Sequence, residues 1–193
     1  MYPILLCSIL SLAIFLEKLW TLRKKRIAPK NFVKNLYSLV KEGKLEEAKA
    51  VCMNSENLLS KILFSILDNA GKTEETLKSI AEDAGRRGIQ ELERFLEGMA
   101  TIASVSTLLG LLGTISGMIK IFSVISYQQV VDPPSLAGGI SEALYTTAAG
   151  LTVAIPTIVG YKFLSGRISR ISQNLEVIVE DFIKLLTDAD KKG

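Results

Sequence analysis

The feature that most constrains this chain is the gathering of its uncharged residues into three long blocks. Asp, Glu, Lys and Arg do not occur in residues 1–16, 98–119 and 143–161. A helix that crosses a bilayer needs about 17–25 mostly apolar residues, a length that the second and third blocks reach. The first block is slightly short, but Leu19 and Trp20 extend its apolar face, and the stems of Glu17 and Lys18 can snorkel. The sequence therefore predicts three membrane-spanning helices, in residues 1–20, 97–122 and 140–163.

A cleaved signal peptide is the alternative interpretation of residues 1–16. Such a peptide carries basic residues before its apolar run and small residues at a cleavage site. In this chain the basic residues follow the run instead, at Arg23, Lys24, Lys25 and Arg26. We therefore favour a membrane anchor.

Lys and Arg also predict the orientation of the spans. Basic residues follow the first span, and Lys162, Arg167 and Arg170 follow the third, whereas residues 123–139 contain neither Lys nor Arg. By the positive-inside rule, the N-terminus and the 123–139 loop lie outside. Residues 21–96 and 164–193 are then cytoplasmic. Because the basic cluster borders a span and lacks interleaved aromatic residues, we expect it to meet anionic lipid rather than nucleic acid.

The sequence predicts helices in the two cytoplasmic segments. Apolar residues recur at helical spacing in residues 31–96 without a Pro. If the pattern is unbroken, Glu74–Phe122 forms one helix that continues into the second span. Within it, Gly85 and Gly88 each weaken the helix by about 1 kcal/mol unless close packing requires them. The C-terminal segment carries a heptad seam, which suits either packing within the chain or a contact between subunits; its residues are Ile168, Ile171, Leu175, Ile178, Phe182 and Leu185. The predicted fold class is an all-α membrane protein whose long helices extend into a helical cytoplasmic domain.

Small residues mark one face of the second span. Ser106, Gly110, Gly113 and Gly117 share that face and let another helix approach closely. Thr114 belongs to a neighbouring polar line. A Thr hydroxyl within a span often bonds only the carbonyl four residues earlier in its own helix, which is the simplest interpretation of a single Thr.

Glu142 is the candidate functional carboxylate, because an ionisable residue near a span is costly unless it has a role. Two structural interpretations compete: Glu142 can lie at the outer interface, favoured by the positive helix N-terminus, or pair with Lys120. Helix geometry places Thr146 on the face of Glu142, whereas Thr147 lies about 140° away. Glu142 and Thr147 therefore cannot both point the same way from a straight helix.

The absence of histidine limits the chemistry. Without histidine there is no His-ligated zinc or haem, no Ser-His-Asp triad and no Cys-His dyad. The two cysteines, Cys7 and Cys52, form no CxxC motif. With no nucleophile placed beside a base, we expect neither an enzyme nor a metal or cofactor site.

Two segments carry a family resemblance. The run LLGLLGTISGMI in residues 108–119 and the runs LAGGISEAL, TTAAGL and VAIP in residues 136–156 resemble the second-span and third-span signatures of the MotA/TolQ/ExbB proton channel family. Three predicted spans resemble its ExbB and TolQ members more than the flagellar MotA, which has an additional span. The sequence departs from the family pattern in two places. Lys120 is an unusual charge at the end of the second span, and Tyr161-Lys162-Phe163 stands where Tyr-Asn is common.

The resemblance implies a ring, usually a pentamer, in the bacterial inner membrane. Such a ring surrounds a dimer of ExbD/TolR-like single-span subunits, conducts protons inward and energises a periplasm-spanning partner of the TonB or TolA kind. By position, the family's ion-path residues fall on Glu142, Thr114 and Thr147. The conserved-motif positions Gly150 and Pro156 join the glycines of the second span as expected helix-packing residues.

Alternatives within and beyond this family stay open. A stator-like ion channel subunit of a flagellar or gliding motor fits the same motifs, and sodium can replace the proton, since hydroxyls serve either ion. A non-conducting membrane scaffold would use the glycine face and the heptads for assembly only.

Overall fold

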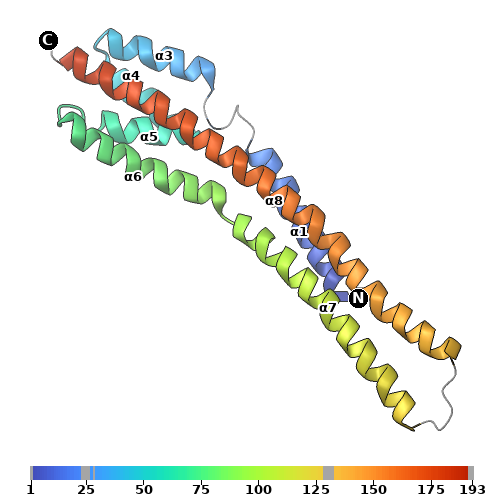
Figure 1. The fold of residues 1–193 in the computed structure, drawn as a ribbon. Helices are drawn as coiled ribbons and strands as arrows, with labels where there is room; N and C mark the ends of the chain where they lie inside the picture. The colour runs from blue at the N-terminus through green and yellow to red at the C-terminus, as the bar shows by residue number, and fades with distance from the viewer. Residues whose placement is uncertain (1, 23–26, 28, 128–132, 191–193) are drawn as a thin grey trace. The chain divides into compact units, whose positions relative to one another are not determined.

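The computed structural model describes residues 2–22, 27, 29–127 and 133–190. All regular structure in those residues is α-helical, which confirms the predicted all-α class. The helices are α1 (Tyr2–Thr21), α3 (Lys30–Lys41), α4 (Leu45–Met53), α5 (Leu58–Leu67), α6 (Glu74–Glu93), α7 (Leu96–Tyr127) and α8 (Pro133–Asp190) (Figure 1). Residues 23–26 of the basic cluster lie outside the described residues.

The chain divides into two compact units. The first unit comprises Met1–Glu17 and Phe95–Leu164, and the second comprises Lys18–Arg94 and Ser165–Gly193. Helix α8 therefore contributes its N-terminal part to the first unit and its C-terminal part to the second.

The second unit has an apolar core centred on α5. Helices α3, α4, α5 and α6 contact one another in chain order. Helix α5 is apolar on most of its surface, as expected for a helix surrounded by others; its fully buried side chains include Leu59, Ile62, Leu63, Ile66 and Leu67. The α5 N-terminus is capped by Asn57, whose side-chain oxygen accepts a 2.8 Å hydrogen bond from the Ser60 amide.

Close packing explains one of the two glycines in α6. A Cβ atom at Gly88 would overlap the side chain of Leu58, whereas a Cβ at Gly85 would meet Ile62 at an ordinary 3.9 Å. Gly88 therefore allows α6 to approach α5 at the cost of helix propensity. The structure shows no comparable requirement at Gly85.

The C-terminal heptad seam packs against the chain's own helices. Ile168, Leu175 and Phe182, spaced seven residues apart, are all buried. The Phe182 ring meets that of Tyr37 edge to face, with 5.8 Å between centroids, and the Tyr37 hydroxyl donates a 3.1 Å hydrogen bond to the Ile178 carbonyl. These contacts support the interpretation of the seam as packing within the chain.

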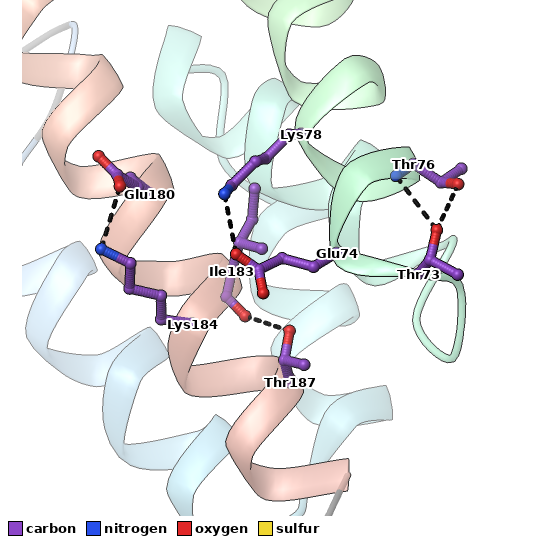
Figure 2. Close-up of polar contacts among 8 residues, drawn as sticks. All are labelled: Thr73, Glu74, Thr76, Lys78, Glu180, Ile183, Lys184 and Thr187. Carbon is purple, nitrogen blue, oxygen red and sulfur yellow. Dashed lines mark hydrogen bonds and ion pairs between the residues drawn. The ribbon is translucent and has the colours of Figure 1, made fainter.

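Polar contacts lie at the start of α6 and near the end of α8 (Figure 2). Thr73 caps α6 by accepting a 3.4 Å hydrogen bond from the Thr76 amide. Two ion pairs lie within single helices at i, i+4 spacing, Lys78–Glu74 at 2.8 Å and Lys184–Glu180 at 3.0 Å. Exposed pairs of this kind stabilise a fold weakly, so the second unit depends mainly on its apolar core.

The long helix that the sequence allowed from residue 74 into the second span is interrupted. Helix α6 ends at Glu93 and α7 begins at Leu96. Between them, Phe95 adopts a φ of 70°, the one positive value among the described non-glycine residues. A left-handed conformation costs a non-glycine residue about 1–2 kcal/mol, so the local preference of Phe95 does not explain this break.

Three helical stretches are long and apolar enough to cross a membrane: Tyr2–Thr21, Glu74–Ser126 and Pro133–Asp188. The second stretch draws its apolar window from α7, since α6 is rich in charge. Only 6% of that window is buried within the chain. Large side chains such as Leu108, Leu112 and Ile119 are exposed, as expected for helices that meet lipid or other chains.

Helices α7 and α8 extend into the connection expected over residues 123–139. Helix α7 continues to Tyr127 and α8 starts at Pro133. Residues 128–132, which connect the two helices, lie outside the described residues.

Candidate functional site

Glycines bring α7 and α8 into backbone contact in the first unit. A Cβ atom at Gly150 would lie 2.6 Å from the Ser106 carbonyl oxygen and 2.9 Å from the Gly110 Cα, and one at Gly110 would lie 3.2 Å from the Thr147 Cα. Real Cβ atoms do not tolerate the shorter of these distances, so the contact depends on glycine.

The remaining expected packing residues differ in their surroundings. A Cβ at Gly117 would lie 2.7 Å from the Ala143 Cβ, and one at Gly113 would overlap the Thr146 side chain. The structure thus places Gly113 and Gly117 at the same α7–α8 contact as Gly110 and Gly150. Pro156 lies inside α8 and is exposed.

Two threonines meet across this contact. The Thr114 and Thr147 hydroxyls form a short hydrogen bond with each other. Thr147 Oγ1 donates to the Gly110 carbonyl on α7 at 3.0 Å, and Thr114 Oγ1 donates to the Ala143 carbonyl on α8 at 3.1 Å. The intrahelical alternative for Thr114, to the Gly110 carbonyl, is longer at 3.5 Å. Both hydroxyls therefore connect the helices rather than only capping their own backbone carbonyls.

This threonine pair has fewer protons than contacts. Each hydroxyl offers one proton and can accept two hydrogen bonds, while three contacts join Thr114 and Thr147 to each other and to the carbonyls of Ala143 and Gly110. Two proton arrangements are possible: Thr114 donates to Thr147 while Thr147 donates to the Gly110 carbonyl, or Thr147 donates to Thr114 while Thr114 donates to the Ala143 carbonyl. Such a pair can reverse its hydrogen-bond direction without moving a heavy atom.

A cavity of about 440 Å³ lies beside the threonine pair, between α7 and α8. Glu142 and Thr146 line it from α8, and Ser116 and Lys120 line it from α7. Glycines 113, 117 and 139 form part of its wall, which explains the open space between closely packed helices. We call this space the Glu142 cavity.

The two faces of α8 separate as the helix geometry predicted. Glu142 and Thr146, four residues apart, line the Glu142 cavity. Thr147 does not line it but points to Thr114 and the Gly110 carbonyl. The three expected ion-path residues therefore form two adjacent groups, a carboxylate in a cavity and a hydroxyl pair between the helices.

Sequence reasoning gave no ion-path role to several polar residues near these groups, although it placed Ser106 on the helix-packing face. Thr146 donates a 2.7 Å hydrogen bond to the Ala143 carbonyl and lines the Glu142 cavity, and Ser116 lines it from α7. Ser106 is fully buried, and its hydroxyl has no hydrogen-bond partner. The shared face of Glu142 and Thr146 was the one available signal, since Ser116 and Ser106 become informative only once α7 and α8 are paired.

Lys120 shares the Glu142 cavity but forms no direct ion pair with Glu142 among the contacts of the described residues. The structural interpretation in which Lys120 neutralises Glu142 by direct contact is therefore not supported.

The described residues contain no cluster of three or more Cys, Asp and Glu side chains that could hold a metal ion.

Comparisons with known proteins concern the same helices. Residues 54–177 match the profile of the MotA/TolQ/ExbB proton channel family, a range that includes Thr114, Glu142 and Thr147. The chain is 30% identical over 182 residues to the biopolymer transport protein exbB1 of Vibrio cholerae, covering 91% of this chain and 78% of that relative.

Two further relatives match over a shorter region. The chain is 38% identical over 103 residues to the Tol-Pal system protein TolQ of Haemophilus influenzae, covering 53% of this chain. It is 35% identical over 105 residues to the biopolymer transport protein ExbB of Neisseria gonorrhoeae, covering 52% of this chain. The matched regions span 45% and 48% of these two relatives, about half their length.

Proposed function

Because the chain belongs to the MotA/TolQ/ExbB proton channel family, we propose that it is a ring-forming subunit of a proton-channel motor in the bacterial inner membrane. The ring, most simply a pentamer, would enclose a dimer of ExbD/TolR-like single-span subunits. Proton flow through the complex would energise a periplasm-spanning partner of the TonB or TolA type. The N-terminus and the α7–α8 connection would face the periplasm, and the second unit the cytoplasm.

The observation that carries this proposal is the threonine pair beside the Glu142 cavity. A proton can bind the Glu142 carboxylate, which is open to the cavity. Water in the cavity would carry it past Thr146 towards α7. The Thr114–Thr147 pair, which allows two hydrogen-bond directions, would reorient as the proton passes. The chain has no histidine, so Glu142, hydroxyls and water supply the path within this subunit.

The energy available suits a motor that takes several protons per step. One charge crossing the membrane releases about 2.3 kcal/mol per 100 mV of potential. Two or more protons would then supply enough free energy to rearrange a partner protein. The exposed apolar faces of α7 and α8 support an assembly in which lipid and neighbouring subunits cover them.

Proton flux in liposomes tests the proposal. The chain is copurified with its single-span partner, reconstituted, and energised by a potassium diffusion potential. We expect Glu142→Gln to reduce inward proton flux by about tenfold or more, the scale on which removal of a positioned acid–base group acts. Glu97→Gln, which changes an acidic residue in the first turn of the neighbouring α7 that does not line the Glu142 cavity, is the control and should conduct normally.

The same experiment separates a channel from a scaffold. A scaffold would assemble with its partner and leave the liposomes as proton-tight as empty ones. Equal flux in the wild type and Glu142→Gln would contradict the assignment of Glu142. Sodium flux measured in parallel distinguishes a sodium-driven stator from a proton channel.

A further inference from the structure

We propose that Lys120 is a specificity-determining residue of the Glu142 cavity, where its ammonium group excludes metal cations such as sodium and leaves Glu142 to bind protons. This inference rests on the proposed function, since it concerns which ion the Glu142 cavity accepts. It begins from the position of Lys120, a charged residue that directly follows the uncharged residues 98–119 of α7.

Lys120 and Glu142 face the same space from opposite helices. Both line the Glu142 cavity, Lys120 from α7 and Glu142 from α8. The other described lining residues are serines, a threonine, glycines and apolar side chains. Lys120 and Glu142 are thus the ionisable groups of the cavity, and its formal charge is zero when both are ionised.

The zero charge of the cavity is unfavourable for sodium. A hard cation binds where oxygen ligands and net negative charge offset its loss of hydration. The cavity offers oxygens from Glu142, Thr146 and Ser116, but the Lys120 ammonium already balances the carboxylate. A sodium ion entering the cavity would add a second positive charge close to the first. Low-dielectric walls weaken the screening of that repulsion.

A proton avoids this penalty because it enters the carboxyl group instead of the cavity volume. Protonated Glu142 is neutral and needs no set of oxygen ligands. Lys120 then leaves the cavity with a net positive charge, which repels metal cations more strongly still. Among the contacts of the described residues, Lys120 shares the cavity without forming a direct ion pair with Glu142, so the carboxylate stays open to a proton.

The test compares sodium and proton movement in the reconstituted complex. Variants are Lys120→Gln, which removes the charge, and Lys120→Arg, which keeps it. Lys162→Gln is the matched control, because Lys162 is an exposed cation on α8 whose ammonium lies over the Tyr161 ring, 5.7 Å from its centroid, and does not line the cavity. Radioactive sodium uptake and internal pH are followed at about 0.1 M NaCl, where the Debye length is about 10 Å.

We expect background sodium uptake in the wild type, Lys120→Arg and Lys162→Gln. In Lys120→Gln we expect sodium uptake to rise about tenfold, which corresponds to 1.4 kcal/mol. Sodium uptake that stays at background in a proton-conducting Lys120→Gln would overturn the proposal, as would substantial sodium uptake in the wild type. Absence of both fluxes in the wild type would instead contradict the proposed function.

A measurement that does not need conduction keeps the test decisive if Lys120→Gln fails to conduct. A hydrophobic carbodiimide modifies protonated carboxyl groups within spans, and a bound cation protects them. Mass spectrometry reports modification at Glu142. Sodium should protect Glu142 in Lys120→Gln and in Lys120→Met, but not in the wild type. Equal modification with and without sodium in all three chains would overturn the proposal.

Discussion

The two units of this chain bury different kinds of side chain. The second unit surrounds α5 with leucine and isoleucine, and residues such as Leu63 and Ile66 are fully buried. The first unit brings α7 and α8 together through Gly110 and Gly150, with threonine hydroxyls between them, and leaves many large apolar side chains of these helices exposed. The second unit is therefore built as a water-soluble fold is, whereas the first unit needs lipid or other chains to cover it.

The two units also place their polar groups differently. Ion pairs of the second unit, such as Lys184–Glu180, lie on the surface. In the first unit, by contrast, Thr114 and Thr147 lie between two helices and bond backbone carbonyls across the contact. Hydroxyls in the first unit thus join two helices, whereas the ion pairs of the second unit lie on the surface of a fold that apolar packing stabilises.

The largest effect is expected from filling the glycine contact of the first unit. Gly150→Val would drive a side chain into the Ser106 carbonyl and the Gly110 backbone. We expect separation of α7 and α8, loss of the assembled complex, and a cost above about 3 kcal/mol, since backbone must move. Size-exclusion chromatography with light scattering in detergent measures assembly.

Gly98→Ala is the control for that substitution. Gly98 lies on α7, and a Cβ there would meet no atom within 4 Å. This variant should assemble as the wild type does. If Gly150→Val also assembles normally, the glycine contact is not what holds the first unit together.

The next largest effect contrasts leucines from the two units. Leu63→Ala leaves a cavity in the core of the second unit, where Leu63 is fully buried, and should lower the free energy of unfolding by about 2–5 kcal/mol. Leu111→Ala changes an exposed leucine of α7 and should leave stability in detergent nearly unchanged. Urea titrations followed by circular dichroism measure both. Equal losses from the two substitutions would show that the units are not built differently.

How much of this contrast can be predicted from the sequence depends on the range of the signal. The three apolar helices follow from local hydropathy, and the divergence of Glu142 and Thr147 follows from helix geometry alone. The pairing of Thr114 with Thr147 joins residues 33 positions apart; only the family resemblance grouped them beforehand. The break at Phe95 has no sequence signal, because neither Pro nor Gly stands there.

The heptad seam illustrates a different limit. Its spacing predicts a continuous apolar face on α8 but does not identify what covers that face. Burial of Phe182 and the hydrogen bond from Tyr37 to the Ile178 carbonyl identify the chain's own helices as the cover. Such long-range contacts are absent from any local pattern.

A moderate effect is expected at Cys52 in the second unit. Burial raises the pKa of the Cys52 thiol from 9.0 to about 11. Because the thiolate is the reactive form, alkylation at pH 8 should be about 100-fold slower in the folded chain than in urea, the factor that two pKa units represent. Site-resolved mass spectrometry after iodoacetamide treatment measures the rate.

The raised pKa of Cys52 also makes the stability of the fold depend on pH. The folded state favours the neutral thiol, so the contribution of Cys52 to stability is fully present below pH 9 and is lost as the pH rises towards 11. Cys52→Ala should remove that part of the pH dependence. Fast alkylation of the folded chain at pH 8 would contradict the packing of α4 against α5.

The smallest effect is expected at the surface of the second unit. A hydrogen bond and the charge of Lys184 lower the pKa of the Glu180 carboxyl, yet both side chains are exposed. Lys184→Gln should therefore produce no measurable change in the urea midpoint at neutral pH. A clear loss of stability would mean that surface charge, and not the apolar core, holds the second unit.

The proton flux of a threonine variant tests the central claim most directly. Thr147→Val keeps the shape of the side chain but removes the hydroxyl that joins Thr114 and the Gly110 carbonyl. Thr152→Val is its matched control on α8, because Thr152 is exposed and bonds only the Ala148 carbonyl of its own helix among its described contacts. We predict that Thr147→Val assembles with its partner but conducts protons about tenfold more slowly or worse, while Thr152→Val conducts normally. Wild-type flux in an assembled Thr147→Val complex would contradict the claim that the threonine pair lies on the proton path.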